Sequence, residues 1–226
     1  MPSARFDAVL FDLDGTLADT APDLNGALNE LLTQESRAPL PVEVLRPHTS
    51  SGTRGMLRVG FGITPGDDAF PRRAQQFITL YTQRLCRETA LFEGMDTVLT
   101  ALEAASIPWG VVTNKPARLT EPLLDALGLG TRAACIVSGD STPHPKPAPD
   151  PLLLACRAIQ RRPERTLYVG DDLRDIQAAR AARMPSAAAA WGYLGTDSPI
   201  EEWQADWIVT NPQALLSLCD IPAQET

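Results

Sequence analysis

Lysine is scarce in this 226-residue sequence. Of its 20 basic residues, 18 are arginine and only Lys115 and Lys146 are lysine. The lysine ammonium is a compact, freely rotating charge, whereas the arginine guanidinium is a planar fork. A buried site built around one small anion can require an ammonium group, so both lysine positions are candidates for a special role.

Closely spaced cysteines and long apolar runs are also lacking. No Cys-x-x-Cys spacing occurs, which argues against a zinc site or a disulfide framework and favours free thiols in a reducing compartment. No apolar run approaches the ~20 residues that span a bilayer. The segment Met1–Asp7 is too short and polar for a signal peptide. We therefore expect a cytoplasmic protein with four scattered free thiols, Cys86, Cys135, Cys156 and Cys219.

Positive charge is in deficit. The chain has 28 acidic residues against 20 basic ones, a formal net charge of -8. Nucleic acids and anionic membranes bind basic surfaces, so neither is an expected partner. With 44% hydrophobic residues, the chain can bury a sizeable core in one large domain or two modest ones.

One short stretch near the N-terminus carries the most chemical information. The apolar run Ala8–Phe11 is typical of a buried strand, and Asp12, Asp14 and a Gly15-Thr16 turn follow it. Two neighbouring carboxylates repel each other unless a cation lies between them. The alternative is that both are solvated turn residues, because Asp-Gly is a common turn pair.

Two kinds of pattern divide the chain. Residues 18–92 show helical apolar spacing and no convincing strand, whereas from Thr97 onward strand and helix patterns alternate. This order predicts a doubly wound parallel α/β sheet interrupted by an all-helical insertion. The expected core comprises residues 1–17 and 93–226, and the expected insertion is 18–92. The helices expected within it are 24–33, 42–46 and 71–87, and the later strands 109–113, 134–137, 166–169, 186–190 and 207–209.

Four polar clusters follow four of the predicted strands. The carboxyl ends of parallel strands meet at one edge of a sheet, so these clusters are expected to converge. Together they supply a carboxylate nucleophile, metal-binding acids, a hydroxyl and an ammonium. Phosphoryl transfer to an aspartate requires such a set, because Mg²⁺ and a fixed cation must offset the repulsion between two anions. The clusters are Asp12/Asp14, Thr113-Asn114, Lys146 and Asp171/Asp172/Asp175.

Simpler interpretations stay open for several of these residues. Asp172 is also a good helix N-cap, and Asp175 a first-turn acid favoured by the helix dipole. Thr113 suits a strand without any further role. Lys115 is either a surface charge at a helix start or a direct participant. The two histidines, His48 and His144, are assigned no chemistry.

The clusters resemble the four motifs of the haloacid dehalogenase superfamily of phosphatases, in order and over nearly the whole chain. That resemblance implies a magnesium-dependent phosphatase with a phospho-aspartate intermediate. It makes Asp12 the nucleophile and Asp14 the general acid and base, whose backbone carbonyl also reaches the metal. The matching segments are Phe11–Leu17, Val111–Asn114, Lys146-Pro147 and Gly170–Asp175.

The resemblance also implies roles for the remaining site residues. Thr113 and the Asn114 amide would hold the phosphate, and Lys146 would neutralise it. Asp12 and Asp14 would contribute to the Mg²⁺ site, and Asp171 would bind the ion directly, with Asp172 or Asp175 in support. The turn residues Gly15 and Thr16 are expected to contact the substrate.

The helical insertion resembles a cap that closes over the site and carries substrate contacts. Asp19–Pro22 and Phe92–Gly94 would be its hinges, and Ser50–Arg54 its specificity loop. Arg54 is the candidate for gripping a distal group of the substrate, with a purely solvated surface arginine as the alternative.

Within the superfamily the sequence is most similar to phosphoglycolate phosphatases and to the branch that dephosphorylates N-acetylmuramic acid 6-phosphate. Both substrates carry a carboxylate away from the phosphate. The expected partner is thus a small phosphate ester, handled by a monomer or homodimer. A sugar phosphomutase of the same superfamily and a non-catalytic, receiver-like phosphate-binding protein are the competing hypotheses.

Overall fold

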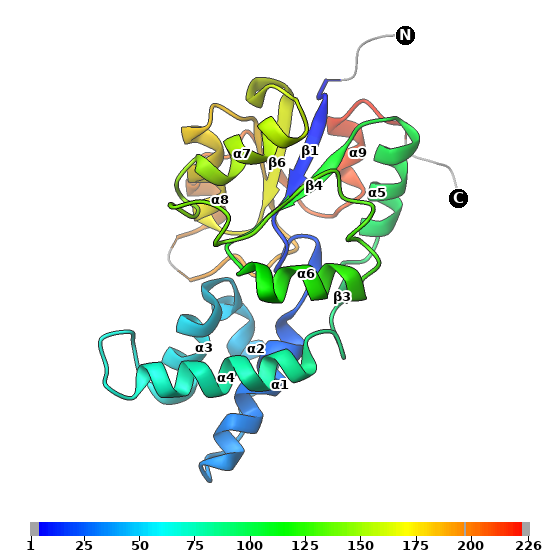
Figure 1. Ribbon diagram of the computed structural model, residues 1–226. Helices are drawn as coiled ribbons and strands as arrows, with labels where there is room; N and C mark the ends of the chain where they lie inside the picture. The colour runs from blue at the N-terminus through cyan, green and yellow to red at the C-terminus, as the bar shows by residue number, and fades with distance from the viewer. Residues whose placement is uncertain (1–4, 197, 223–226) are drawn as a thin grey trace.

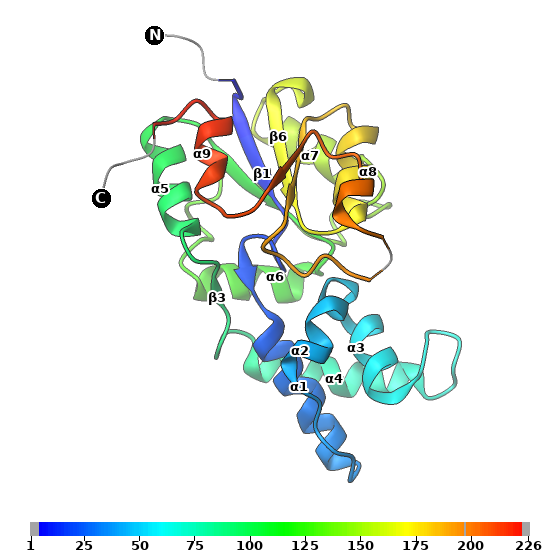
Figure 2. The same ribbon diagram turned by 180° about the vertical axis from the view of Figure 1, so that it is seen from behind.

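The computed structural model describes residues 5–196 and 198–222, so the first four residues of the Met1–Asp7 segment lie outside it. A six-stranded parallel sheet forms the core (Figures 1 and 2). Its strand order is β5-β4-β1-β6-β7-β8. This confirms the predicted α/β fold class. Its strands are β1 (Ala8–Phe11), β4 (Trp109–Val112), β5 (Ile136–Val137), β6 (Thr166–Gly170), β7 (Ser186–Ala189) and β8 (Trp207–Val209).

Helices cover both faces of this sheet, because alternate residues of each strand point to opposite sides. Val9 and Phe11 of β1 pack with one cluster, whereas Leu10 packs with another. The first cluster includes side chains of α5 (Met95–Ala104), α6 (Ala117–Ala126) and α9 (Ala214–Leu218). The second includes side chains of α7 (Asp150–Ala158) and α8 (Leu173–Ala181).

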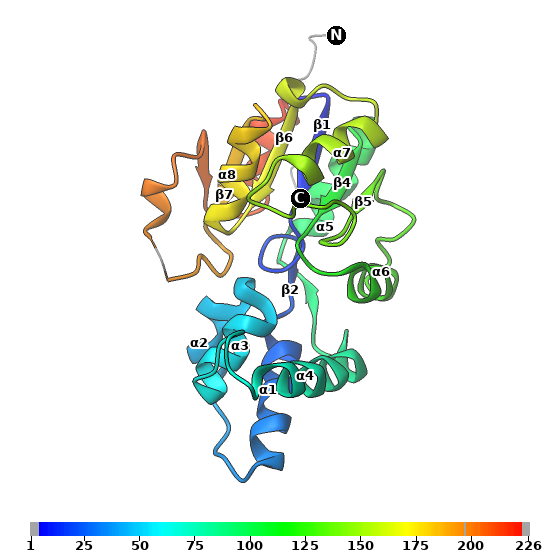
Figure 3. The same cartoon turned by 60° about the vertical axis from the view of Figure 1, so that its left-hand side comes forward.

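Between β1 and β4 the chain forms a helical layer with its own apolar core (Figure 3). Leu24, Leu28 and Leu31 of α1 pack with Phe77 and Tyr81 of α4, as helical spacing of apolar residues dictates. Leu119 of α6 belongs to this cluster too, so α6 packs against the insertion. The elements are α1 (Ala21–Gln34), α2 (Val42–Leu45), the 3-10 helix η1 (Arg46–Ser51), α3 (Gly52–Phe61) and α4 (Phe70–Arg84).

The expectation of no strand in residues 18–92 is wrong at both ends of that range. Two-residue strands β2 (Ala18–Asp19) and β3 (Ala90–Leu91) pair antiparallel where the chain leaves and re-enters the core. Such short strands give too little apolar alternation to be read from sequence. The segment Ser50–Arg54, expected as a specificity loop, lies at the end of η1 and the start of α3.

All four cysteines are free thiols, as predicted. Among the described residues, no helix combines the length and apolar character needed to cross a membrane.

Candidate active site

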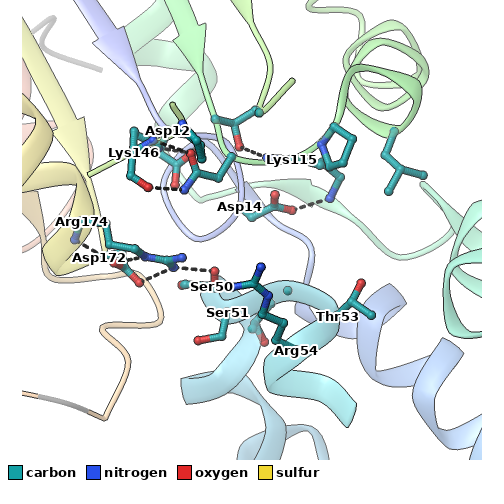
Figure 4. Close-up of a pocket in the computed structure, with 18 of the residues that line it drawn as sticks. Asp12, Asp14, Ser50, Ser51, Thr53, Arg54, Lys115, Lys146, Asp172 and Arg174 are labelled. Atoms are coloured by element: carbon teal, nitrogen blue, oxygen red, sulfur yellow. Dashed lines mark hydrogen bonds and ion pairs between the residues drawn. The ribbon is translucent and has the colours of Figure 1, made fainter. Parts of the chain in front are cut away.

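A cavity of about 510 Å³ lies between the carboxyl edge of the sheet and the helical insertion. Small-molecule sites fall in this size range. Figure 4 shows Asp12, Asp14 and Lys146 on its core side and Ser50 and Arg54 on its insertion side. The polar clusters expected to converge therefore face a space enclosed by both parts of the chain.

Asp12 directly follows β1 and is almost fully buried. Its Oδ1 atom accepts a hydrogen bond from the Leu13 backbone N–H at 2.7 Å, and lies 3.0 Å from Lys146 Nζ. Its Oδ2 atom has no hydrogen-bond partner within the described part of the chain. One oxygen is thus fixed by two donors, and the other is available to an incoming group.

Lys146 is a tightly enclosed cation at this edge, with its side chain only 2% exposed. Besides Asp12, its ammonium contacts Asp175 Oδ1 at 2.6 Å, the Tyr168 hydroxyl at 2.8 Å and the Val112 carbonyl at 3.0 Å. Burial opposes the charged form, but the two carboxylates outweigh it and raise the pKa of Lys146. The lysine is therefore a fixed cation inside the site.

Three buried carboxylates surround this region. One oxygen each from Asp12, Asp171 and Asp175 lies within 4.8 Å of the others. Burial, reinforced by the Asp12 and Asp175 charges, raises the pKa of Asp171 well above its ordinary value. Burial also raises the pKa of Asp175 to about 7, although Lys146 opposes this shift. Three carboxylates against one ammonium leave an excess of negative charge, which fits a divalent cation with oxygen ligands.

Asp171 is held in place by groups that come from distant segments. Its Oδ1 accepts from the Thr16 hydroxyl at 2.8 Å, and its Oδ2 accepts from the Tyr193 N–H at 2.9 Å and the Ser50 hydroxyl at 3.3 Å. Gly15 has a φ of +90°, and a Cβ there would lie 2.2 Å from Asp171 Oδ2. Gly15 and Thr16 therefore lie against Asp171, and neither is among the residues that line the cavity. Their expected contact with substrate stays a prediction.

Asp172 and Asp175 have different partners and therefore different roles. Asp172 caps α8, accepting from the Arg174 N–H, and its carboxylate forms an ion pair with the Arg174 guanidinium at 2.8 Å. The bonds from Arg174 outweigh the effect of burial and lower the pKa of Asp172. Asp175 completes the capping box by accepting from the Asp172 N–H at 3.1 Å, and its other oxygen faces Lys146. Only Asp175 of the two belongs to the acidic group, and it is a capping residue as well.

Asp14 lies apart from that group. Its Oδ1 accepts from the Thr20 hydroxyl at 2.6 Å and from Lys115 Nζ at 2.7 Å. Lys115 is only 7% exposed and also donates to the Tyr81 hydroxyl of α4 at 2.8 Å. Lys115 is therefore not a solvated surface charge.

The residues after β4 support the site through backbone contacts. Thr113 is buried, and its hydroxyl oxygen accepts from the Lys115 N–H at 3.2 Å. The Asn114 side chain donates to the Lys146 carbonyl at 2.8 Å and accepts from the Lys146 N–H at 3.0 Å. Both residues line the cavity, and the Asn114 side-chain amide fixes the loop that carries Lys146.

Arg54 stands in the first turn of α3 and lines the cavity from the insertion side (Figure 4). Within residues 5–196 and 198–222 it makes no hydrogen bond or ion pair. Its neighbours Ser50 to Thr53 line the same wall, and Arg174 donates to the Ser50 carbonyl at 2.7 Å. An unpaired guanidinium at this wall can receive an anionic group.

Sequence reasoning missed several residues of the site. Tyr81 and Tyr168 fit the apolar patterns of a helix and a strand, yet their hydroxyls contact the two lysines. Thr20, Tyr193 and Arg174 also make site contacts that the sequence does not indicate. No local pattern marks such residues, because each reaches its partner across more than 20 positions or through an adjacent turn.

The structure combines a parallel α/β sheet with a helical insertion after β1. Buried aspartates follow β1 and β6, and a lysine lies between them. These features define a hydrolase-like class of protein with an aspartate-centred site. The family model described as haloacid dehalogenase-like hydrolase matches residues 9–189, and the chain belongs to that family. This confirms the family resemblance found in the sequence.

Individual relatives extend over nearly the whole chain. A phosphoglycolate phosphatase of Xanthomonas campestris pv. campestris strain 8004 is 45% identical over 92% of this chain and 94% of its own. An N-acetylmuramic acid 6-phosphate phosphatase of Pseudomonas putida is 38% identical, over 96% and 97%. A crystal structure of a predicted phosphoglycolate phosphatase from Haemophilus somnus 129pt has a TM-score of 0.83 at 28% identity, covering 95% of this chain and 98% of that one.

Proposed function

We propose that this hydrolase is a magnesium-dependent phosphatase that acts on a small, carboxylate-bearing phosphate ester through a phospho-aspartate. The observation that best supports this proposal is the environment of Asp12, which lines the cavity. Lys146 and the Leu13 N–H fix its Oδ1 atom, whereas its Oδ2 atom has no partner among the described residues. The family and its phosphatase relatives support the same reaction class.

Two half-reactions use the aspartates in turn. The Asp12 Oδ2 atom attacks phosphorus and forms a new P–O bond, while the bond to the leaving oxygen breaks and Asp14 gives that oxygen a proton. A water then attacks the phospho-aspartate and loses a proton to Asp14, releasing inorganic phosphate and restoring Asp12. The Lys146 ammonium offsets the charge that accumulates between the phosphate and the carboxylates.

The acidic group suits the metal of this reaction. Asp12, Asp171 and Asp175 would hold Mg²⁺, which prefers carboxylate oxygens and keeps several waters. When bound, the ion supplies the positive charge that the site lacks. Asp172 is engaged with Arg174, so we assign the supporting ligand to Asp175.

The insertion supplies selection. We propose residues 18–92 as a cap whose hinges lie next to β2 and β3, and which excludes water from the closed cavity. Arg54 would pair with the carboxylate of the substrate, because a charge-assisted bond to an unpaired guanidinium is strong and directional. Both 2-phosphoglycolate and N-acetylmuramic acid 6-phosphate, the substrates implied by the relatives' names, carry such a carboxylate.

A panel of phosphate esters tests this function. Purified protein with Mg²⁺ should release inorganic phosphate from 2-phosphoglycolate or N-acetylmuramic acid 6-phosphate with a kcat/KM well above that for glycerol phosphates, which match in phosphate but lack the carboxylate. Asp12→Asn is the control for a contaminating phosphatase. Conversion of a sugar phosphate to its isomer without phosphate release would establish the phosphomutase instead, and no turnover of any ester would establish a binding protein.

A further inference from the structure

Asp14 is held by one of its two carboxylate oxygens only. The Thr20 hydroxyl and the Lys115 ammonium both donate to Oδ1, at 2.6 and 2.7 Å. Among the residues that the structure describes, Oδ2 has no hydrogen-bond partner, and Asp14 lines the cavity. Two donors on one oxygen fix the rotation of the carboxylate and direct the other oxygen to the space where an ester would lie.

The second contact of Lys115 comes from the helical insertion. Tyr81 of α4 accepts from Lys115 Nζ at 2.8 Å, and the ammonium lies 4.7 Å from the centre of the Tyr81 ring. Lys115 itself belongs to the core, in the segment that joins β4 to α6. The lysine therefore bridges the core carboxylate and the insertion.

The surroundings hold this bridge in the closed arrangement. Tyr81 is 2% exposed and stacks on Phe77, with ring planes 7° apart. Leu119 of α6 packs in the same apolar cluster, and α6 begins two residues after Lys115. If the insertion moved away, Lys115 would lose its tyrosine partner and gain solvent, so its contact with Asp14 would be weaker.

We propose that Lys115 is the positioning residue of Asp14, and that Tyr81 makes this positioning depend on closure of the insertion. The inference rests on the proposed function, because it presumes that Asp14 Oδ2 hands a proton to the leaving oxygen as the P–O bond breaks. It adds that the proton donor is placed correctly only when α4 covers the cavity. While the site is open to water, Asp14 is therefore not positioned to donate its proton.

The test compares two esters that differ in their need for a proton. Ethyl phosphate has a poor leaving group that must be protonated, whereas 4-nitrophenyl phosphate expels a stable anion. Misplacing a catalytic group by 1 Å costs about 10²-fold. Because kcat/KM reports the half-reaction in which the leaving group departs, Lys115→Met should lower kcat/KM for ethyl phosphate about 10²-fold and that for 4-nitrophenyl phosphate less than about tenfold. Tyr81→Phe should show the same selectivity with a smaller loss, about tenfold on ethyl phosphate.

A matched variant separates positioning from general loosening of the insertion. Arg46 also joins the insertion to the β2 region, through its ion pair with Asp19 at 2.8 Å, but it does not touch Lys115 or Asp14. Arg46→Gln should change both esters equally. An equal loss of kcat/KM on the two esters in Lys115→Met and Tyr81→Phe would overturn the proposal, since a purely structural lysine has no reason to distinguish leaving groups.

Folding and substrate identity are controlled separately. If Lys115→Met does not fold, as judged by its thermal unfolding, Tyr81→Phe and Thr20→Val decide the question, because each removes one hydroxyl and leaves the ion pair. The ethyl phosphate comparison needs no carboxylate on the substrate. Failure of the carboxylate panel would therefore refute the proposed substrate class and leave this test intact.

Discussion

Lys146 and Asp12 form an ion pair, 3.0 Å between Nζ and Oδ1, in which the lysine is almost completely buried. The other lysine of the chain, Lys115, pairs in the same way with Asp14 at 2.7 Å. Each lysine thus holds one of the two aspartates that follow β1. An ammonium can reach several oxygens from a single nitrogen, and this accounts for lysine at two positions in a chain that otherwise uses arginine.

Lys146→Arg is expected to abolish most activity although it keeps the charge. One nitrogen now contacts four oxygens, and a larger planar guanidinium cannot occupy that place without displacing a carboxylate. We expect kcat to fall by about 10²-fold or more, as for loss of one preorganised electrostatic group. If Lys115 were a surface charge, Lys115→Arg would leave kcat unchanged. Because Lys115 is buried between Asp14 and Tyr81, we expect this variant to lower kcat as well. Steady-state kinetics at saturating Mg²⁺ measure both, and full activity of either variant would contradict the role given to that lysine.

Asp12→Asn should reduce turnover to near background while the fold persists. The amide keeps the size of the carboxylate and can still bond the Leu13 region, but it is not a nucleophile. Thermal unfolding serves as the check on the fold. Activity within tenfold of the unsubstituted enzyme would exclude Asp12 as the attacking group. Mass spectrometry of acid-quenched enzyme provides the direct measurement, since a phosphoryl adduct should be found in the unsubstituted protein and be missing from the variant.

Mg²⁺ is expected to raise the melting temperature of the protein. A ligand that binds only the folded state stabilises it by mass action, and here it also relieves repulsion among three buried carboxylates. Asp171→Asn should remove this dependence on Mg²⁺. Asp172→Asn is the matched control, because the adjacent aspartate pairs with Arg174 and lies outside the acidic group. A Mg²⁺ response that vanishes in Asp172→Asn and survives in Asp171→Asn would reverse the ligand assignment.

Arg54→Ala should lower kcat/KM selectively for carboxylate-bearing esters. A charge-assisted, bidentate contact contributes about 1.5–3 kcal/mol, which corresponds to roughly 10- to 150-fold. 4-Nitrophenyl phosphate has no carboxylate, so its hydrolysis should hardly change. Arg58→Ala, one turn further along α3 and outside the cavity lining, controls for loss of a positive charge. Equal losses on both substrates would move the carboxylate contact to another residue.

Much of the fold and the convergence of the polar residues were predictable from local signals and from the order of the elements. The strand at Trp207–Val209 has the predicted bounds, and the apolar spacing of α1 and α4 identified the buried sides of those helices. Asp12, Asp171 and Asp175 converge because strands of a parallel sheet end at one edge, a rule that needs only the order of the elements.

Contacts that depend on the packing of distant segments were not predictable. From the sequence, Lys115 could be either a surface charge or a direct participant in the site. The sequence could not decide this because the tyrosine partner of Lys115 comes from α4. Nor could it choose between Asp172 and Asp175, which stand three positions apart in one helix start. Only the three-dimensional structure shows which of them faces Lys146 and which pairs with Arg174.

The pairing of β2 with β3 has a consequence for how such a molecule can change. The chain departs from the sheet and returns to it through two adjacent strands, joined at Ala18 with Leu91 and at Asp19 with Ala90. The whole insertion is therefore connected to the core through one short two-stranded stem, β2 and β3. Replacing it with the corresponding segment of a relative, spliced at that stem, would leave every core aspartate in its place. In such a chimera the new segment must supply a hydroxyl to Lys115. The chimera would then have the substrate specificity of the relative that provided the segment.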